Sequence, residues 1–149
     1  TAGGIVASRL AIWDGSSWSA HASGLNQTVT AMTVFDDGGG EALYAGGVFT
    51  GAGGLGVNQI ARWDGSSWSA LGTGVAGSSV GALAVYDDGS GAALYAAGLL
   101  FEAGGVPVDM IARWDGASWS ALDSELSATS ASPTVEVLAA EVIPALDGA

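Results

Sequence analysis

Apolar and polar positions alternate over short segments separated by turn-forming residues, a pattern that predicts β-strands along the chain. The segments Ile60–Trp63 and Trp68–Leu71 flank the sequence DGSS, and Val80–Tyr86 and Ala92–Ala97 flank DDGSG. Asp and Gly in these positions favour tight hairpin turns. The 25 glycines also make helices unfavourable. We therefore expect an all-β protein built from hairpins.

The hairpins recur along the sequence. The segment WDGSSWSA occurs at Trp13–Ala20 and Trp63–Ala70, and WDGASWSA occurs at Trp114–Ala121, so the spacings are 50 and 51 residues. We call these the tryptophan hairpins, and we call the DDGGG and DDGSG segments with their flanking strands the aspartate hairpins. A tryptophan hairpin followed by an aspartate hairpin predicts a four-stranded antiparallel unit. We expect a single repeat domain over residues 1–149, with repeats at approximately 1–49, 50–101 and 102–149.

A four-stranded unit of about 50 residues is typical of a β-propeller blade. The segments Ala61–Gly72 (ARWDGSSWSALG) and Asp87–Gly98 (DDGSGAALYAAG) resemble the tandem propeller-type, broadly kelch-like repeats of large exported bacterial proteins. The resemblance covers about residues 1–125. It implies propeller-type blades, bacterial-type export and an extracellular or cell-surface location, but it does not imply an activity.

The third repeat is incomplete, because no aspartate hairpin follows Trp114–Ala121. Residues 133–149 diverge from the repeat, although Thr134–Val142 still predicts a strand. Three blades do not close a ring, since propellers have about four to eight. We expect a strand or blade from another chain, or two chains that close one ring. The candidate assembly residues are Thr134, Val135, Val137, Leu138 and Val142.

The ends of the sequence suggest processing. The segment Ile143–Gly148 (IPALDG) resembles the start of bacterial C-terminal sorting signals of the Ile-Pro-Thr-Leu type. That resemblance implies cleavage after Ala149 and release outside the cell, and an edge strand ended by Pro and Gly is the alternative. Since Thr1 is not Met, we expect either a removed signal peptide or a sequence that begins within a longer protein.

The charge is strongly acidic, with 15 Asp and Glu residues against three Arg, and a net charge of −12. Such a surface repels phosphate, so nucleic acid and anionic lipid are poor partners. No apolar run reaches the roughly 18 residues of a membrane span. The chain has no cysteine, which excludes disulfides and thiolate metal sites. The excess charge should make self-association sensitive to salt.

Tryptophans are the main candidates for ligand binding. Their faces could stack on sugar rings, with one shallow site in each repeat. The structural interpretation is a cross-strand aromatic pair that fixes each hairpin and packs on the next blade, and the repetition favours it. The six residues are Trp13, Trp18, Trp63, Trp68, Trp114 and Trp119.

Carboxylates in the glycine-rich turns are weak candidates for Ca²⁺. They are Asp36, Asp37, Asp87 and Asp88. Their spacing is not that of an EF-hand loop, and no bidentate Glu follows. Solvated acids that form hairpin turns account for them better, so we expect no cofactor and no metal.

Other polar residues do not predict catalysis. Arg62 and Arg113 occupy one repeat position, where the first repeat has Ile12, and we expect them to tie blades together through acidic partners. His21 is the only histidine, and its repeat equivalent is Leu71. The sequence has no catalytic-triad pattern, no phosphate-binding loop and no nucleophile elbow. We therefore expect that the protein is not an enzyme.

Three functional hypotheses follow. The first is an extracellular, self-assembling structural protein, such as a filament or sheath subunit, whose partner is a second copy of itself. In that case Thr134–Val142 adds beside the segment Gly4–Trp13 of a neighbouring chain. The alternative is a carbohydrate-binding, lectin-like module whose partners are glycans. The third is that the repeats belong to a longer, closed propeller.

Overall fold

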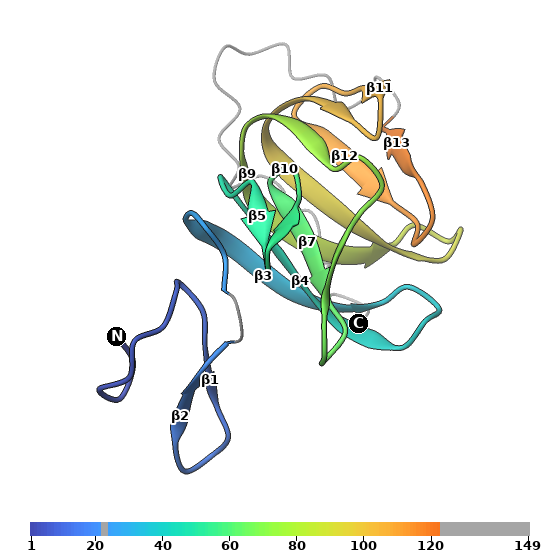
Figure 1. Cartoon of the computed structure of the whole chain (residues 1–149). Helices are drawn as coiled ribbons and strands as arrows, with labels where there is room; N and C mark the ends of the chain where they lie inside the picture. Colours follow the sequence, from blue (N-terminus) through green and yellow to red (C-terminus); the bar gives the residue numbers. More distant parts are fainter. Residues whose placement is uncertain (22–23, 123–149) are drawn as a thin grey trace, which may run out of the picture.

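The structure is a computed structural model that describes residues 1–21 and 24–122. These residues form antiparallel β-sheets and no helix, which confirms the all-β prediction (Figure 1). Among these residues, no sheet closes on itself. The described ranges also contain no helix that could cross a membrane.

The first large sheet has the strand order β3-β4-β7-β8. Strands β3 and β4 are the first aspartate hairpin, and β7 and β8 are the second tryptophan hairpin. The two hairpins join where β4 pairs with β7, with Leu43 opposite Trp63. The strands are β3 (Val29–Asp36), β4 (Glu41–Gly47), β7 (Ile60–Trp63) and β8 (Trp68–Ala70).

The second large sheet repeats this order with β9, β10, β12 and β13, and a short β11 extends it at the end of β10. Short β5 and β6 form a separate hairpin between β4 and β7. The strands are β5 (Gly51–Ala52), β6 (Leu55–Gly56), β9 (Val75–Asp87), β10 (Ala92–Ala103), β11 (Val106–Pro107), β12 (Ile111–Trp114) and β13 (Trp119–Ala121).

The pairing of hairpins differs from the prediction. We expected each tryptophan hairpin to pair with the aspartate hairpin that follows it, but it pairs with the one that precedes it. Alternating hairpins give the same periodicity in either pairing, so the repeat alone does not decide between them. As a result, the third tryptophan hairpin completes a sheet. The first, formed by β1 (Ala11–Trp13) and β2 (Trp18–Ala20), is a two-stranded sheet of its own.

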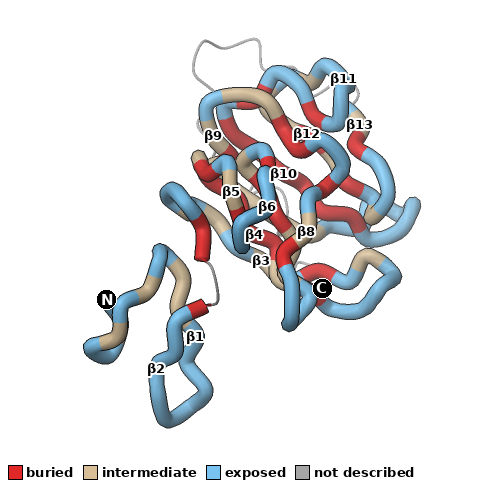
Figure 2. Tube along the Cα trace, in the orientation of Figure 1, coloured by how far each residue is buried: buried red, intermediate tan, exposed pale blue. Residues whose placement is uncertain are grey.

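The two large sheets pack face to face and enclose the main core (Figures 1 and 2). Strand β9 of the second sheet contacts β3 and β4 of the first. The first sheet contributes Phe35, Ala42, Tyr44 and Ile60, and the second contributes residues that include Leu94, Ala96, Ala112, Trp114 and Trp119.

A second cluster lies on the opposite face of the first sheet. It contains Ala45, Ala61 and Trp68 of that sheet, with Leu25, Phe49, Ala52 and Val57 from its connections. Leu10, which precedes β1, packs against this cluster. Backbone hydrogen bonds from Leu25 to Ser8 and from His21 to Leu10 hold the N-terminal segment in place. Hairpin β1–β2 itself lies at the margin of the molecule (Figure 1).

Candidate functional site

The two apolar clusters are repeat equivalents with one difference. Ala45 and Trp68 of the second cluster correspond to Ala96 and Trp119 of the main cluster, 51 residues later in the chain. The main cluster also contains Phe35, Ala42 and Tyr44, which come from an aspartate hairpin of the neighbouring sheet. The second cluster has no such contribution from the described residues. Among the described residues, one layer of side chains is therefore absent from the outer face of the first sheet.

This difference leaves apolar side chains open to solvent. Leu83 and Val85 on β9 pack against the main cluster. Their equivalents on β3, Met32 and Val34, are 51% and 57% exposed. Leu43 lies directly opposite Val34 on β4 and is only half-buried. We call the surface formed by Met32, Val34 and Leu43 the open face.

In the described part of the chain, strand β1 has a free edge. Its equivalents β7 and β12 each pair with a strand of an aspartate hairpin, β4 or β10. In the part of the chain that the structure describes, β1 pairs with β2 alone. Ile12 on β1 is 43% exposed. The free edge and the open face thus mark the place where an aspartate hairpin lies in the other sheets.

Tryptophans form cross-strand pairs in all three hairpins. The ring centroids are 5.3 Å apart for Trp13 and Trp18, and the other two pairs have similar geometry. Trp68, Trp114 and Trp119 are buried and Trp63 is half-buried. Trp13 and Trp18 differ, being 50% and 42% exposed. Only the first pair therefore presents much indole surface to a ligand.

The buried indoles pack at the boundary between consecutive sheets. The Nε1–H of Trp119 donates a hydrogen bond of 2.9 Å to the backbone oxygen of Leu71. At the equivalent boundary one repeat earlier, buried His21 replaces Leu71 and its ring lies 4.1 Å from that of Trp63. His21 thus takes the packing position of a leucine, as the repeat alignment suggests.

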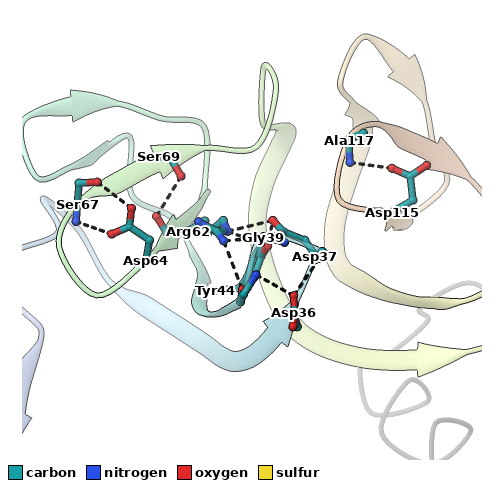
Figure 3. A network of polar contacts seen from close by, with 12 residues as sticks. Asp36, Asp37, Gly39, Tyr44, Arg62, Asp64, Ser67, Ser69, Asp115 and Ala117 are labelled. Atoms are coloured by element: carbon teal, nitrogen blue, oxygen red, sulfur yellow. Dashed lines mark hydrogen bonds and ion pairs between the residues drawn. The ribbon is translucent and has the colours of Figure 1, made fainter.

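A polar network joins the two hairpins of the first sheet (Figure 3). The guanidinium of Arg62 lies 3.0 Å from the Asp37 carboxylate, and the Tyr44 hydroxyl donates to the same carboxylate at 2.7 Å. Burial raises the pKa of Asp37, but the hydrogen bonds from Tyr44 and Gly39 and the charge of Arg62 outweigh it and lower the pKa. Burial and the bond to Asp37 raise the pKa of Tyr44. All these groups belong to one sheet.

The second sheet has a looser version of this network. Arg113 lies 3.9 Å from Asp88 and donates to the Ser90 hydroxyl at 3.1 Å. Each arginine thus finds an acidic partner in the preceding predicted repeat. The ion pairs therefore join two of the predicted repeats, as expected, but each lies within one observed sheet because the tryptophan hairpin pairs with the preceding aspartate hairpin.

The other turn carboxylates cap their own turns. Asp36 Oδ1 accepts from the amides of Gly38 and Gly40. Asp64 Oδ1 accepts from the amides of Ser66 and Ser67, and these bonds lower its pKa. Asp87 and Asp88 repeat this arrangement. Within residues 1–21 and 24–122, no group of three or more His, Cys, Asp or Glu is placed to hold a metal ion.

The other predicted site residues, Thr134 to Val142, lie outside the described residues. Sequence reasoning missed Met32, Val34 and Ile12. A signal was present, because β3 carries apolar residues on both faces, with Phe35 on one and Val34 on the other. That pattern is typical of a strand covered on both sides.

No protein-family model, no curated protein and no solved structure matches the chain. The open face and the free edge of β1 are therefore the features from which a function can be inferred.

Proposed function

We propose that this chain is an extracellular structural protein that assembles with copies of itself through the open face and the free edge of β1. The observation that carries the proposal is the exposure of Met32 and Val34. Their equivalents Leu83 and Val85 are covered by an aspartate hairpin of the neighbouring sheet. In the proposed assembly, a segment of another copy covers the open face in the same way. Contiguous exposed apolar surface of this kind marks an interaction site.

In this proposal the sheets act as propeller-type blades, and contact between unlike ends continues the stack from one copy to the next. Such head-to-tail contacts give an open filament, or a ring where the rotation closes. The extracellular location rests on the resemblance to exported bacterial repeat proteins.

The energetics require a contact larger than the open face alone. Full burial of an aliphatic side chain contributes about 1.5–3 kcal/mol, and Met32 and Val34 are already half covered. Association costs about 4–15 kcal/mol in lost translational and rotational freedom. The contact must therefore include further groups, and in this proposal the free edge of β1 and the exposed indoles of Trp13 and Trp18 supply them.

Charge modulates the contact. A net charge of −12 makes copies of the chain repel one another. Salt screens this repulsion over a Debye length of about 10 Å at 0.1 M, whereas apolar burial persists at high salt. Assembly should therefore strengthen as salt is added.

Substitution on the open face tests the proposal by sedimentation velocity. Val34→Asp places a charge in the proposed contact, so we expect smaller species than in the parent protein at equal concentration. Leu55→Asp is the matched control, because Leu55 is 44% exposed and its repeat equivalent Val106 remains 37% exposed on the sheet where Leu83 and Val85 are covered. Val34→Ser removes apolar area without adding charge and should show a weaker shift in the same direction. Unchanged sedimentation of the folded Val34→Asp variant contradicts the proposal.

The exposed pair Trp13 and Trp18 favours carbohydrate binding as a second candidate function. Two adjacent indoles, 50% and 42% exposed, offer a stacking surface for a sugar ring. Titration with oligosaccharides, followed by tryptophan fluorescence, tests it. A monomer whose fluorescence saturates with a sugar, and which loses that response in Trp18→Ala, supports the second function over the first.

A further inference from the structure

An arginine marks the junction of hairpins in both large sheets. Tyr44 on β4 lies directly opposite Arg62 on β7, and Tyr95 on β10 lies opposite Arg113 on β12. Each arginine also reaches an aspartate in the turn of the paired hairpin. The junction is thus polar in both cases, with a cation on the tryptophan hairpin and an Asp–Tyr pair on the aspartate hairpin.

The first tryptophan hairpin lacks the cationic half of this junction. Its sequence from Trp13 to Ala20 is identical to that from Trp63 to Ala70, yet Ile12 stands at the arginine position. Ile12 on β1 lies opposite Ser19 on β2, as Arg62 on β7 lies opposite Ser69 on β8. An aspartate hairpin at the free edge would place its carboxylate and tyrosine beside an isoleucine. Leaving a partly buried carboxylate without its guanidinium is unfavourable.

Residues 134–142 lack the other half of the junction. Their sequence, TVEVLAAEV, contains neither aspartate nor tyrosine, and six of the nine residues are apolar. This segment follows the third tryptophan hairpin at the place where the repeat would supply an aspartate hairpin. Ile12 thus stands where the other tryptophan hairpins have arginine, and residues 134–142 offer no Asp–Tyr pair, although they include Glu136 and Glu141.

We infer that the free edge of β1 pairs with the segment Thr134–Val142 of a second copy, with an apolar side chain opposite Ile12. The inference names the partner in the proposed assembly and rests on that function. The incoming strand pairs with β1 as β4 pairs with β7 and as β10 pairs with β12. Its inward side chains then cover Leu43, just as Ala42 and Tyr44 of β4 cover Leu94, the repeat equivalent of Leu43, in the main cluster. Backbone pairing and apolar cover thus come from one strand.

Cysteine cross-linking of the full chain tests this pairing, because the native sequence has no cysteine. Ile12→Cys is combined with one cysteine at each position from 134 to 142, and the oxidised proteins are compared on non-reducing gels. Side chains alternate between the two sides of a strand, so we expect efficient cross-links at every second position. Ser19→Cys with the same partners is the control. Ser19 lies one strand further from the edge, about 10 Å from the incoming strand and beyond the reach of a disulfide.

The outcomes separate this inference from the proposed function. Dimers and larger bands with the alternating pattern support the pairing between copies. Cross-links only within one chain overturn the second copy as the partner. If no cross-link exceeds the Ser19→Cys background, the pairing itself is overturned. Sedimentation of the parent protein as large species would then still support self-assembly.

Discussion

At the level of single residues, the first sheet depends on charged groups that are largely shielded from water. The side chains of Arg62 and Asp37 are 18% and 14% exposed, and the Tyr44 hydroxyl completes the network. The second sheet has the same residues in a looser arrangement, in which Asp88 is 42% exposed. The two networks form a natural comparison within one molecule.

Replacing Arg62 tests the contribution of the tighter network. Arg62→Met leaves the shielded Asp37 carboxylate without its cation, so we expect the free energy of unfolding to fall by about 1–2 kcal/mol. Arg113→Met, at the looser and more exposed pair, should cost less. Chemical denaturation of both variants measures the difference. Equal losses would show that shielding does not set the strength of the pair.

Acid should destabilise the fold through the same residue. The pKa of Asp37 is lowered in the folded state, so its ionised form stabilises the protein above the ordinary aspartate pKa of 3.8. This stability is lost as the pH falls through the lowered folded pKa. Denaturation at several pH values from about 5 to about 2 should show decreasing stability, with a shallower slope in Asp37→Asn. A slope that is unchanged in Asp37→Asn would contradict this assignment.

The first glycine of each Ala-Gly-Gly turn packs closely against a tryptophan, and substitution there tests how much this packing contributes to stability. A Cβ on Gly53 would lie 2.8 Å from Cδ1 of Trp68, and its φ is +58°. Gly53→Ala should therefore destabilise by about 1–3 kcal/mol. Gly54→Ala is the control, because Gly54 also has a positive φ, +83°, but open space beside it. Thermal or chemical denaturation should give the larger loss for Gly53→Ala, and equal losses would mean that backbone strain alone sets the cost.

At the level of elements, the hairpins could be predicted because each has its own local signal. Trp63 and Trp68 flank a turn whose Asp64 caps the backbone, as the DGSS sequence indicates. The choice of partner hairpin could not be predicted, because it depends on long-range contacts such as Arg62 with Asp37. The sequence identifies Arg62 and Arg113 as ion-pair residues. Because tryptophan and aspartate hairpins alternate, it does not show whether the acidic partners lie in the preceding or the following hairpin.

Hydrogen exchange tests the observed pairing. Strands β4 and β7 have neighbours on both sides, whereas β8 is an edge and β1–β2 is an isolated pair in the described part of the chain. In dilute, low-salt solution we expect amides of β4 and β7 to exchange more slowly than those of β8, and those of β1–β2 to exchange fastest. Slow exchange across β8 and β9, with a fast-exchanging β4–β7 junction, would support the opposite pairing of hairpins.

At the level of the whole molecule, the sequence predicts open ends, and the structure corrects their location. We expected a hairpin to be missing after the third tryptophan hairpin. The third tryptophan hairpin instead completes the second sheet by pairing with the aspartate hairpin before it. The described gap lies beside β1, at the open face of the first sheet. Periodicity could not locate it, because the gap depends on which hairpins share a sheet. Met32 and Val34 identify it through their exposure.

The measurement that tests self-assembly most directly is the mass and shape of the purified chain, by light scattering with negative-stain microscopy, at low and high salt. Since the net charge is −12, we predict larger particles at high salt, as filaments or as closed rings of a few copies. A folded monomer at both salt concentrations would contradict self-assembly through the open face.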